Sequence, residues 1–162
     1  LGLSKRQAIL PIVCATESRQ RWIGKDSMDN KETSADMVFE YAVDGCSVPK
    51  DVISVRFKEG LLKIGNWAFF DCKSLESVTL PSTLVETGDH VFQQCSNLKE
   101  VIFNDVLQKI GNGAFCNCAS LERVKIPSTV TEIGQNGAFG SCSNLREVIF
   151  NDGLQKIGDV AF

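Results

Sequence analysis

The sequence predicts an α/β solenoid, a right-handed coil of short units stacked on one another around an apolar core. Three observations carry this prediction: a repeat of about 23 residues, the apolar residue types that recur within it, and the shortness of each unit. A unit of this length cannot bury its apolar residues alone, so neighbouring units must stack to cover them. The repeat is marked by Phe69, Phe92, Phe115, Phe139 and Phe162.

The composition permits a buried core and argues against several classes of function. Of the 162 residues, 43% are apolar and 23% are charged. The formal net charge of −3 disfavours nucleic acid as a partner, and no apolar run approaches the roughly 20 residues of a membrane-spanning helix. Because the chain has one histidine and no nucleophile motif, we expect no enzyme, no catalytic residue, no metal site and no cofactor.

The chain divides into a leader and an array of repeats. We interpret residues 1–40 as a leader or linker that is largely irregular, residues 41–57 as a segment leading into the array with a degenerate first coil, and residues 58–162 as repeats truncated at the C-terminus. Because the chain starts at Leu1 rather than at a methionine, we expect a fragment. The apolar run Ala8–Ala15 has the composition of the end of a secretory signal, but an incidental apolar patch is the favoured interpretation.

Each unit contains one expected strand and one expected outer turn. Apolar residues at period two, such as Val78 and Leu80, are typical of a strand with one buried face. We expect one parallel sheet of short strands, over Leu75–Leu80, Leu98–Phe103, Leu121–Ile126 and Leu145–Phe150. On the outer side we expect short turns or helical pieces, over Asn66–Phe69, Asp89–Phe92, Asn112–Phe115 and Gln135–Phe139. A glycine recurs once per unit, as at Gly111, and we expect it at a bend with positive φ.

Cysteine forms another column of the repeat, three residues after each phenylalanine. The column consists of Cys72, Cys95, Cys118 and Cys142. We interpret these residues as core packing, because zinc ligands converge on one point whereas these lie one coil apart. Their spacing also leaves disulfides between coils open. Cys116 is expected to face outward as the most reactive thiol. The odd total of seven slightly favours a cytoplasmic location, with a secreted or cell-surface location as the alternative.

The most complete unit runs through residues 126–134 and 138–145. It resembles the BspA-like class of leucine-rich repeats, and the resemblance extends from about Val52 to Phe162. Thr87 departs from the family pattern, which has isoleucine before the glycine. The resemblance implies a curved solenoid with a surface that contacts protein or glycan. Family members are cell-surface adhesins in some microbes and intracellular scaffolds in others, and they share no catalytic residue.

The outward positions of the expected strands form a candidate partner-binding face. By alternation along each strand they are Arg56, Ser77, Thr79, Glu100, Ile102, Arg123, Lys125, Glu147 and Ile149. Ile102 and Ile149 are apolar, which indicates either anchors for a partner or simply a preference for strand geometry. We expect a non-enzymatic protein–protein interaction scaffold whose partner is a protein of unknown identity. The alternative is a cell-surface or secreted adhesin that binds host protein or glycan.

Charged residues alternate in sign from unit to unit, so the full period is about 46 residues. One column runs Lys63, Glu86, Lys109, Glu132 and Lys156, another Glu76, Lys99, Glu122 and Arg146, and a third Glu100, Arg123 and Glu147. Neighbouring strands lie about 4.8 Å apart, so each column places opposite charges side by side. Exposed pairs contribute only about 0.2–1 kcal/mol each, but a slip of one unit would bring like charges together. We hypothesise that the alternation opposes misaligned stacking.

Reversing one charge tests this hypothesis. Arg123→Glu places three acids in succession in its column, so it should lower the free energy of unfolding more at low salt than at high salt. Denaturant titrations at two salt concentrations measure the difference. A loss of stability that is independent of salt contradicts the hypothesis.

Overall fold

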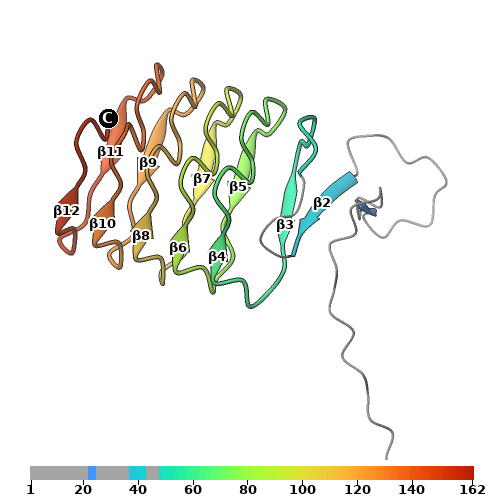
Figure 1. Ribbon diagram of the computed structural model, residues 1–162, viewed down its shortest axis with the longest axis horizontal. Coiled ribbons are helices and arrows are strands. Elements are labelled where there is room, and N and C mark those ends of the chain that lie inside the picture. Colours follow the sequence, from blue (N-terminus) through green and yellow to red (C-terminus); the bar gives the residue numbers. More distant parts are fainter. Residues whose placement is uncertain (1–21, 25–36, 43–47) are drawn as a thin grey trace, which may run out of the picture.

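The computed structural model describes residues 22–24, 37–42 and 48–162, and these form a solenoid of short strands (Figure 1). Most of the expected leader, with Ala8–Ala15, Cys14 and Cys46, lies outside the described residues. The strands are β1 (Trp22–Gly24), β2 (Met37–Tyr41), β3 (Val55–Phe57), β4 (Lys63–Ile64), β5 (Ser77–Thr79), β6 (Glu86–Thr87), β7 (Glu100–Ile102), β8 (Lys109–Ile110), β9 (Arg123–Lys125), β10 (Glu132–Ile133), β11 (Glu147–Ile149) and β12 (Lys156–Ile157).

Each repeat contributes two strands rather than the single one expected. The shorter strands form a continuous parallel sheet in the order β12-β10-β8-β6-β4, which we call the short-strand column. In this sheet Ile133 pairs in register with both Ile110 and Ile157. The longer strands β3, β5, β7, β9 and β11 form the long-strand column, and the last four lie within the four strands expected from the sequence. The prediction of one parallel sheet is therefore corrected to two columns of parallel strands.

The outer segments of the coils are turns, and the described residues contain no helix. The turns were expected, whereas the helical pieces offered with them are not found. The reason lies in the backbone, because each outer segment holds residues with left-handed φ. Trp67 and Asp71 both have φ of 61°, and His90 and Gln94 have φ of 55° and 64°. A right-handed helix needs φ near −63° at every position, so it cannot contain these residues.

The long-strand column is interrupted at every second coil. β5 pairs with β7 and β9 pairs with β11, both in parallel register. Within the described residues, no strand pairing joins β3 to β5 or β7 to β9. Each interruption follows a coil that carries phenylalanine at the end of its long strand, Phe57 or Phe103, where the other coils have Leu80 or Ile126. The interruptions thus coincide with the coils that carry the larger side chain.

An N-terminal hairpin precedes the repeats. β2 pairs in parallel with β3, and β1 pairs antiparallel with β2. Tyr41 of β2 is fully buried, with its ring centroid 5.3 Å from that of Phe69. The backbone N–H of Gly65 donates a hydrogen bond of 3.2 Å to the Tyr41 hydroxyl. β2 thus supplies the first aromatic ring of the core, a role that the sequence had not revealed.

The recurring phenylalanines lie in one internal row, which confirms the central prediction of stacking. Successive ring centroids from Phe69 to Phe162 are separated by 5.0, 5.4, 5.2 and 5.5 Å, and the interplanar angles are between 6° and 20°. Phe69, Phe92, Phe115 and Phe139 are at most 1% exposed. The cysteine column packs beside them, and Cys72, Cys95 and Cys118 are fully buried. We call this row the phenylalanine ladder.

The recurring glycines serve close packing rather than positive φ. Positive φ is found at Gly60, Gly113 and Gly137, which are outside the recurring column, so that prediction was wrong. A Cβ on Gly111 would lie 2.3 Å from the carbonyl oxygen of Gly88 in the preceding coil. Gly88 and Gly134 meet backbone atoms of their neighbouring coils in the same way. The column lacks side chains because the backbones of successive coils touch there.

Adding a methyl group at Gly111 tests this explanation. Gly111→Ala should lower the free energy of unfolding by about 2–3 kcal/mol, because backbone cannot move aside as a side chain can. Gly60→Ala is the matched control, since its Cβ meets nothing within 4 Å and its cost comes from a φ of +81° alone, about 1 kcal/mol. Denaturant unfolding measures both. Equal losses would show that close packing is not the constraint.

Candidate partner-binding face

The structure places all nine residues of the candidate face on the long-strand column. They are exposed on β3, β5, β7, β9 and β11: Arg56, Ser77, Thr79, Glu100, Ile102, Arg123, Lys125, Glu147 and Ile149. The residues between them, such as Val78 and Val124, are buried in the core. Alternation along the strands therefore gave the correct orientation of each side chain. Their role in binding stays a prediction.

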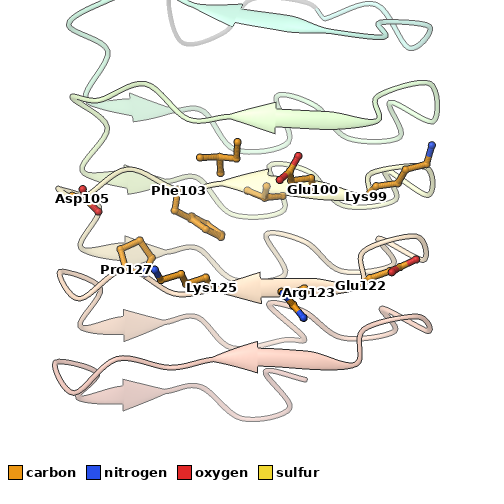
Figure 2. A pocket seen from close by; sticks show the side chains of 10 residues that line it. Lys99, Glu100, Phe103, Asp105, Glu122, Arg123, Lys125 and Pro127 are labelled. Carbon is orange, nitrogen blue, oxygen red and sulfur yellow. The ribbon is translucent and has the colours of Figure 1, made fainter.

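A slot opens on this face between β7 and β9, where the strand pairing is interrupted (Figure 2). Its volume is about 730 Å³, and Cα atoms of the two strands still approach within 8 Å. Lys99 and Glu122 lie at one end, and Asp105 and Pro127 at the other. The slot is lined by Lys99, Glu100, Val101, Ile102, Phe103, Asp105, Glu122, Arg123, Lys125 and Pro127.

A second hollow of about 830 Å³ spans the coils of β3, β5 and β7 and so includes the interruption between β3 and β5. Phe57 and Leu80 line it from the first two of these coils. Ile102, Phe103 and Asp105 line both hollows and so form a ridge between them. Ile102 is 48% exposed and is one of several exposed large apolar side chains, but it is the one that lines both hollows. The sequence indicated Ile102 but gave no sign of the hollows beside it.

Ion pairs join the coils whose strands are paired. Lys99 contacts Glu76 at 3.0 Å between the β7 and β5 coils, and Arg123 contacts Glu147 at 2.6 Å between β9 and β11. Across the slot, within the described residues, no ion pair links Glu100 to Arg123. On the long-strand side, these two ion pairs therefore lie within two-coil blocks, and none among the described residues joins Glu100 to Arg123 between the blocks.

The short-strand column carries its own ion pairs. Lys63 contacts Glu86 at 2.7 Å, and Glu132 contacts Lys109 at 3.4 Å and Lys156 at 3.0 Å. The hydrogen bond from Lys156, with a smaller contribution from Lys109, lowers the pKa of Glu132. The predicted juxtaposition of opposite charges is confirmed at these contacts.

The cysteine column is a row of free thiols hydrogen-bonded to the phenylalanine ladder. The Sγ atoms of Cys95, Cys118 and Cys142 lie 3.1, 3.2 and 3.2 Å from carbonyl oxygens of phenylalanines in the preceding coil. Burial raises the pKa of Cys95 to about 12 and that of Cys72 to about 11. Cys116 is also free and is partly exposed. Within the described residues, no group of three or more potential ligands is placed to hold a metal ion.

An aromatic cluster lies on the outer turns. The rings of Trp67 and His90 stack with centroids 4.1 Å apart, and Phe70 meets Trp67 edge-on at 5.3 Å. A Cβ on Gly113 would lie 2.4 Å from His90 Nδ1, so the stack requires glycine in the next coil. Residues 67, 90 and 113 occupy equivalent positions of successive repeats, and this cluster was not identified from the sequence.

The fold and face define a class of protein, the repeat solenoid with an exposed sheet of short parallel strands. The family model described as the BspA type leucine rich repeat region (6 copies) matches residues 40–162. The chain therefore belongs to the BspA-type leucine-rich-repeat family. Among curated proteins, none matches the sequence. No helix capable of crossing a bilayer occurs in the part of the chain that the structure describes.

Solved structures of bacterial leucine-rich-repeat proteins are similar to this chain. The leucine-rich-repeat protein of T. pallidum is 28% identical over 80% of this chain, with a TM-score of 0.61. A leucine rich cell surface protein from Faecalibacterium prausnitzii is 32% identical over 68%, with a TM-score of 0.62. The pneumococcal vaccine antigen PcpA is 27% identical over 70%, with a TM-score of 0.58. The chain covers 61%, 30% and 28% of these three proteins.

The burial of the thiols predicts their order of reactivity. Under native conditions at pH 8, iodoacetamide should modify Cys116 at least ten times faster than Cys95 or Cys118, because the buried thiols keep their protons and are shielded from the reagent. Cys116 and Cys118 share the tryptic peptide of residues 110–123, so fragment ions from tandem mass spectrometry assign the label to each cysteine. Denatured protein is the control, in which all the rates should converge. Equal rates of modification in the native protein would contradict the burial of the cysteine column.

Proposed function

We propose that this chain is a non-enzymatic protein-interaction scaffold that binds its partner through the exposed face of the long-strand column. The observation that carries the proposal is the exposed Ile102, which lines both hollows and shares with Ile149 an apolar character on a face whose other candidate residues are polar. A large exposed apolar residue beside a hollow is typical of a binding anchor. The stacked core holds this face in one conformation, so little ordering entropy is lost on binding.

A second candidate is a cell-surface or secreted adhesin that contacts host protein or glycan. It is supported by the 32% identical relative, which is titled a cell surface protein. The relatives lend no support to the slight preference for a cytoplasmic location that the cysteine count suggested. In both candidates residues 58–162 act as the binding array, preceded by a lead-in segment at 41–57 and a leader at 1–40.

Site-specific crosslinking tests the proposed face. A photo-reactive amino acid at Lys125, inside the slot, should crosslink one discrete protein from extracts of the source cells. The same residue at Gln108, which is exposed beside the short-strand column, is the matched control and should not. The captured protein is then purified, and its Kd is measured for the wild-type chain and for the Ile102→Asp variant. The Kd for the variant should be at least ten-fold higher.

Four outcomes separate the candidates or exclude both of them. Capture only from the medium or from intact cell surfaces favours the adhesin, and capture from cytosol favours the intracellular scaffold. Crosslinking that is equal at positions 125 and 108, or binding unaffected by Ile102→Asp, shows that this face is not the binding surface.

A further inference from the structure

The chain contains the dipeptide Asn-Gly twice on its outer turns, as Asn112-Gly113 and as Asn136-Gly137. Glycine after asparagine leaves the backbone nitrogen open to the asparagine side chain, because glycine has no side chain of its own. Asparagine is one of the residue types that heat alters chemically. Both glycines are buried and the two dipeptides are identical, so a difference in reactivity between them depends on how the fold holds each one.

Four hydrogen bonds hold the first dipeptide between neighbouring coils. The N–H of Asn112 donates to the Asp89 carboxylate at 2.8 Å, and its carbonyl oxygen accepts from the N–H of His90 at 2.7 Å. The side-chain Oδ1 of Asn112 accepts from the N–H of Gln135 at 2.8 Å, and the N–H of Gly113 donates to the carbonyl oxygen of Gln135 at 3.0 Å. The side-chain amide and the backbone nitrogen that would attack it are therefore both held by hydrogen bonds.

The second dipeptide contains an extra residue, because its unit of the repeat is one residue longer than the units on either side of it. Asn136 occupies the position of Gly113, with φ of 56° against 54°, so Gly137 is the extra residue. At this position in the three preceding coils the N–H donates to a carbonyl oxygen of the next coil, from Trp67, His90 and Gly113. Among the described residues Asn136 forms no such bond. The hydrogen bonding between coils is thus interrupted at the turn that contains the extra residue.

The reacting groups of Asn136-Gly137 are correspondingly free. Among the described residues, the hydrogen bonding of this dipeptide consists of one bond, from the N–H of Gly140 to the carbonyl oxygen of Gly137 at 2.9 Å. Asn136 is exposed, and within the same residues neither its side chain nor the N–H of Gly137 has a partner. The left-handed φ of 56° is unfavourable for a residue other than glycine. Little therefore opposes a rearrangement of the turn that brings the side chain and the backbone nitrogen together.

We propose that Asn136 is a site of spontaneous deamidation by water, whereas Asn112 is protected by its hydrogen bonds. The backbone nitrogen of Gly137 attacks Cγ of Asn136 and forms a C–N bond. The bond from Cγ to the side-chain nitrogen breaks, and that nitrogen leaves as ammonia with the proton lost by the backbone nitrogen. Water then opens the cyclic succinimide at either carbonyl carbon, which gives aspartate or isoaspartate. One water is consumed, one ammonia is released, and nothing is oxidised or reduced.

Deamidation changes both the charge and the backbone of the turn. Either product carries a negative charge in place of a neutral amide, and isoaspartate also adds a methylene group to the main chain. Folded chains of one sequence therefore divide with time into populations of different charge. The inference is independent of the proposed function, because neither asparagine belongs to the candidate partner-binding face.

Mass spectrometry of the full chain tests the proposal. The folded protein is incubated at pH 8 and sampled over time, and each conversion of amide to acid raises the mass by about 1 Da. Each dipeptide shares its tryptic peptide with a further asparagine, so fragment ions from tandem mass spectrometry assign the site. We expect Asn136 to convert at least ten times faster than Asn112. In urea the two rates should agree within two-fold, and a sample digested without incubation gives the background.

Variants of Asp89 test the protection of Asn112. Asp89→Ala removes the acceptor of the Asn112 N–H, so it should raise the rate at Asn112 at least three-fold and leave the rate at Asn136 unchanged. Asp89→Asn is the matched control, because an asparagine Oδ1 can accept the same hydrogen bond, as that of Asn112 does from Gln135. This control should keep the wild-type rate at Asn112. A thermal melt of each variant checks that it folds.

Three results overturn the proposal. The first is equal rates at the two asparagines in the folded protein. The second is no conversion at Asn136 in the folded protein over a period in which the protein in urea converts fully. The third is a folded Asp89→Ala variant in which the rate at Asn112 is unchanged, which shows that the hydrogen bonds do not protect it. The first two comparisons use the wild-type chain and do not depend on how the variants fold.

Discussion

The fold depends on the direct stacking of equivalent residues in successive coils, and above all on the phenylalanine ladder. Ring spacings of 5.0 to 5.5 Å bring each face into contact with the next, so burial of one ring requires the presence of its neighbours. Stacked aromatic pairs add roughly 0.5–1.5 kcal/mol beyond the burial of their area. The contact is possible only because backbones also touch at the glycine column, where Gly111 leaves no room for a Cβ. The buried thiols of Cys95 and Cys118 donate hydrogen bonds to the backbone carbonyl oxygens of Phe69 and Phe92 in the preceding coils.

The two strand columns differ in the continuity of their strand pairing. The short-strand column pairs without interruption from β4 to β12, so it fixes the relative position of all the coils. The long-strand column must also accommodate alternate phenylalanines, and Phe103 packs edge-on against Phe115 at 5.8 Å. Its strands remain paired in blocks of two and separate after each such ring. One side of the solenoid is therefore a continuous sheet, and the other is a row of two-strand blocks with hollows between them.

Much of the fold could be predicted from the sequence, because a repeated column of one residue type has few physical explanations. The row of phenylalanines, the buried cysteines and the exposed face containing Ile102 all followed from spacing alone. The short strands could not be found, since two residues such as Lys63 and Ile64 are too few to show a period. The hollows were not predicted, because they depend on differences between alternate coils. The sequence shows that one coil has Phe103 where the next has Ile126, but it does not show that strand pairing is interrupted there. Thr87, which replaces the isoleucine of the repeat pattern, is another detail that the sequence could not predict. Its hydroxyl accepts a hydrogen bond of 3.0 Å from the N–H of Gly111.

The coincidence of ion pairs with strand pairs gives the 46-residue period a physical meaning. Arg123 contacts Glu147 in the strand with which β9 pairs, and it has no ion pair with Glu100 across the slot. Within a block, hydrogen bonds hold the charges close enough to neutralise one another. Between blocks, where a coil carries phenylalanine at the end of its long strand, Glu100 has no ion pair with Arg123 among the described residues. An apolar hollow and charges that are not paired across it thus occur at the same place, which together are what a charged amphipathic partner needs in order to bind.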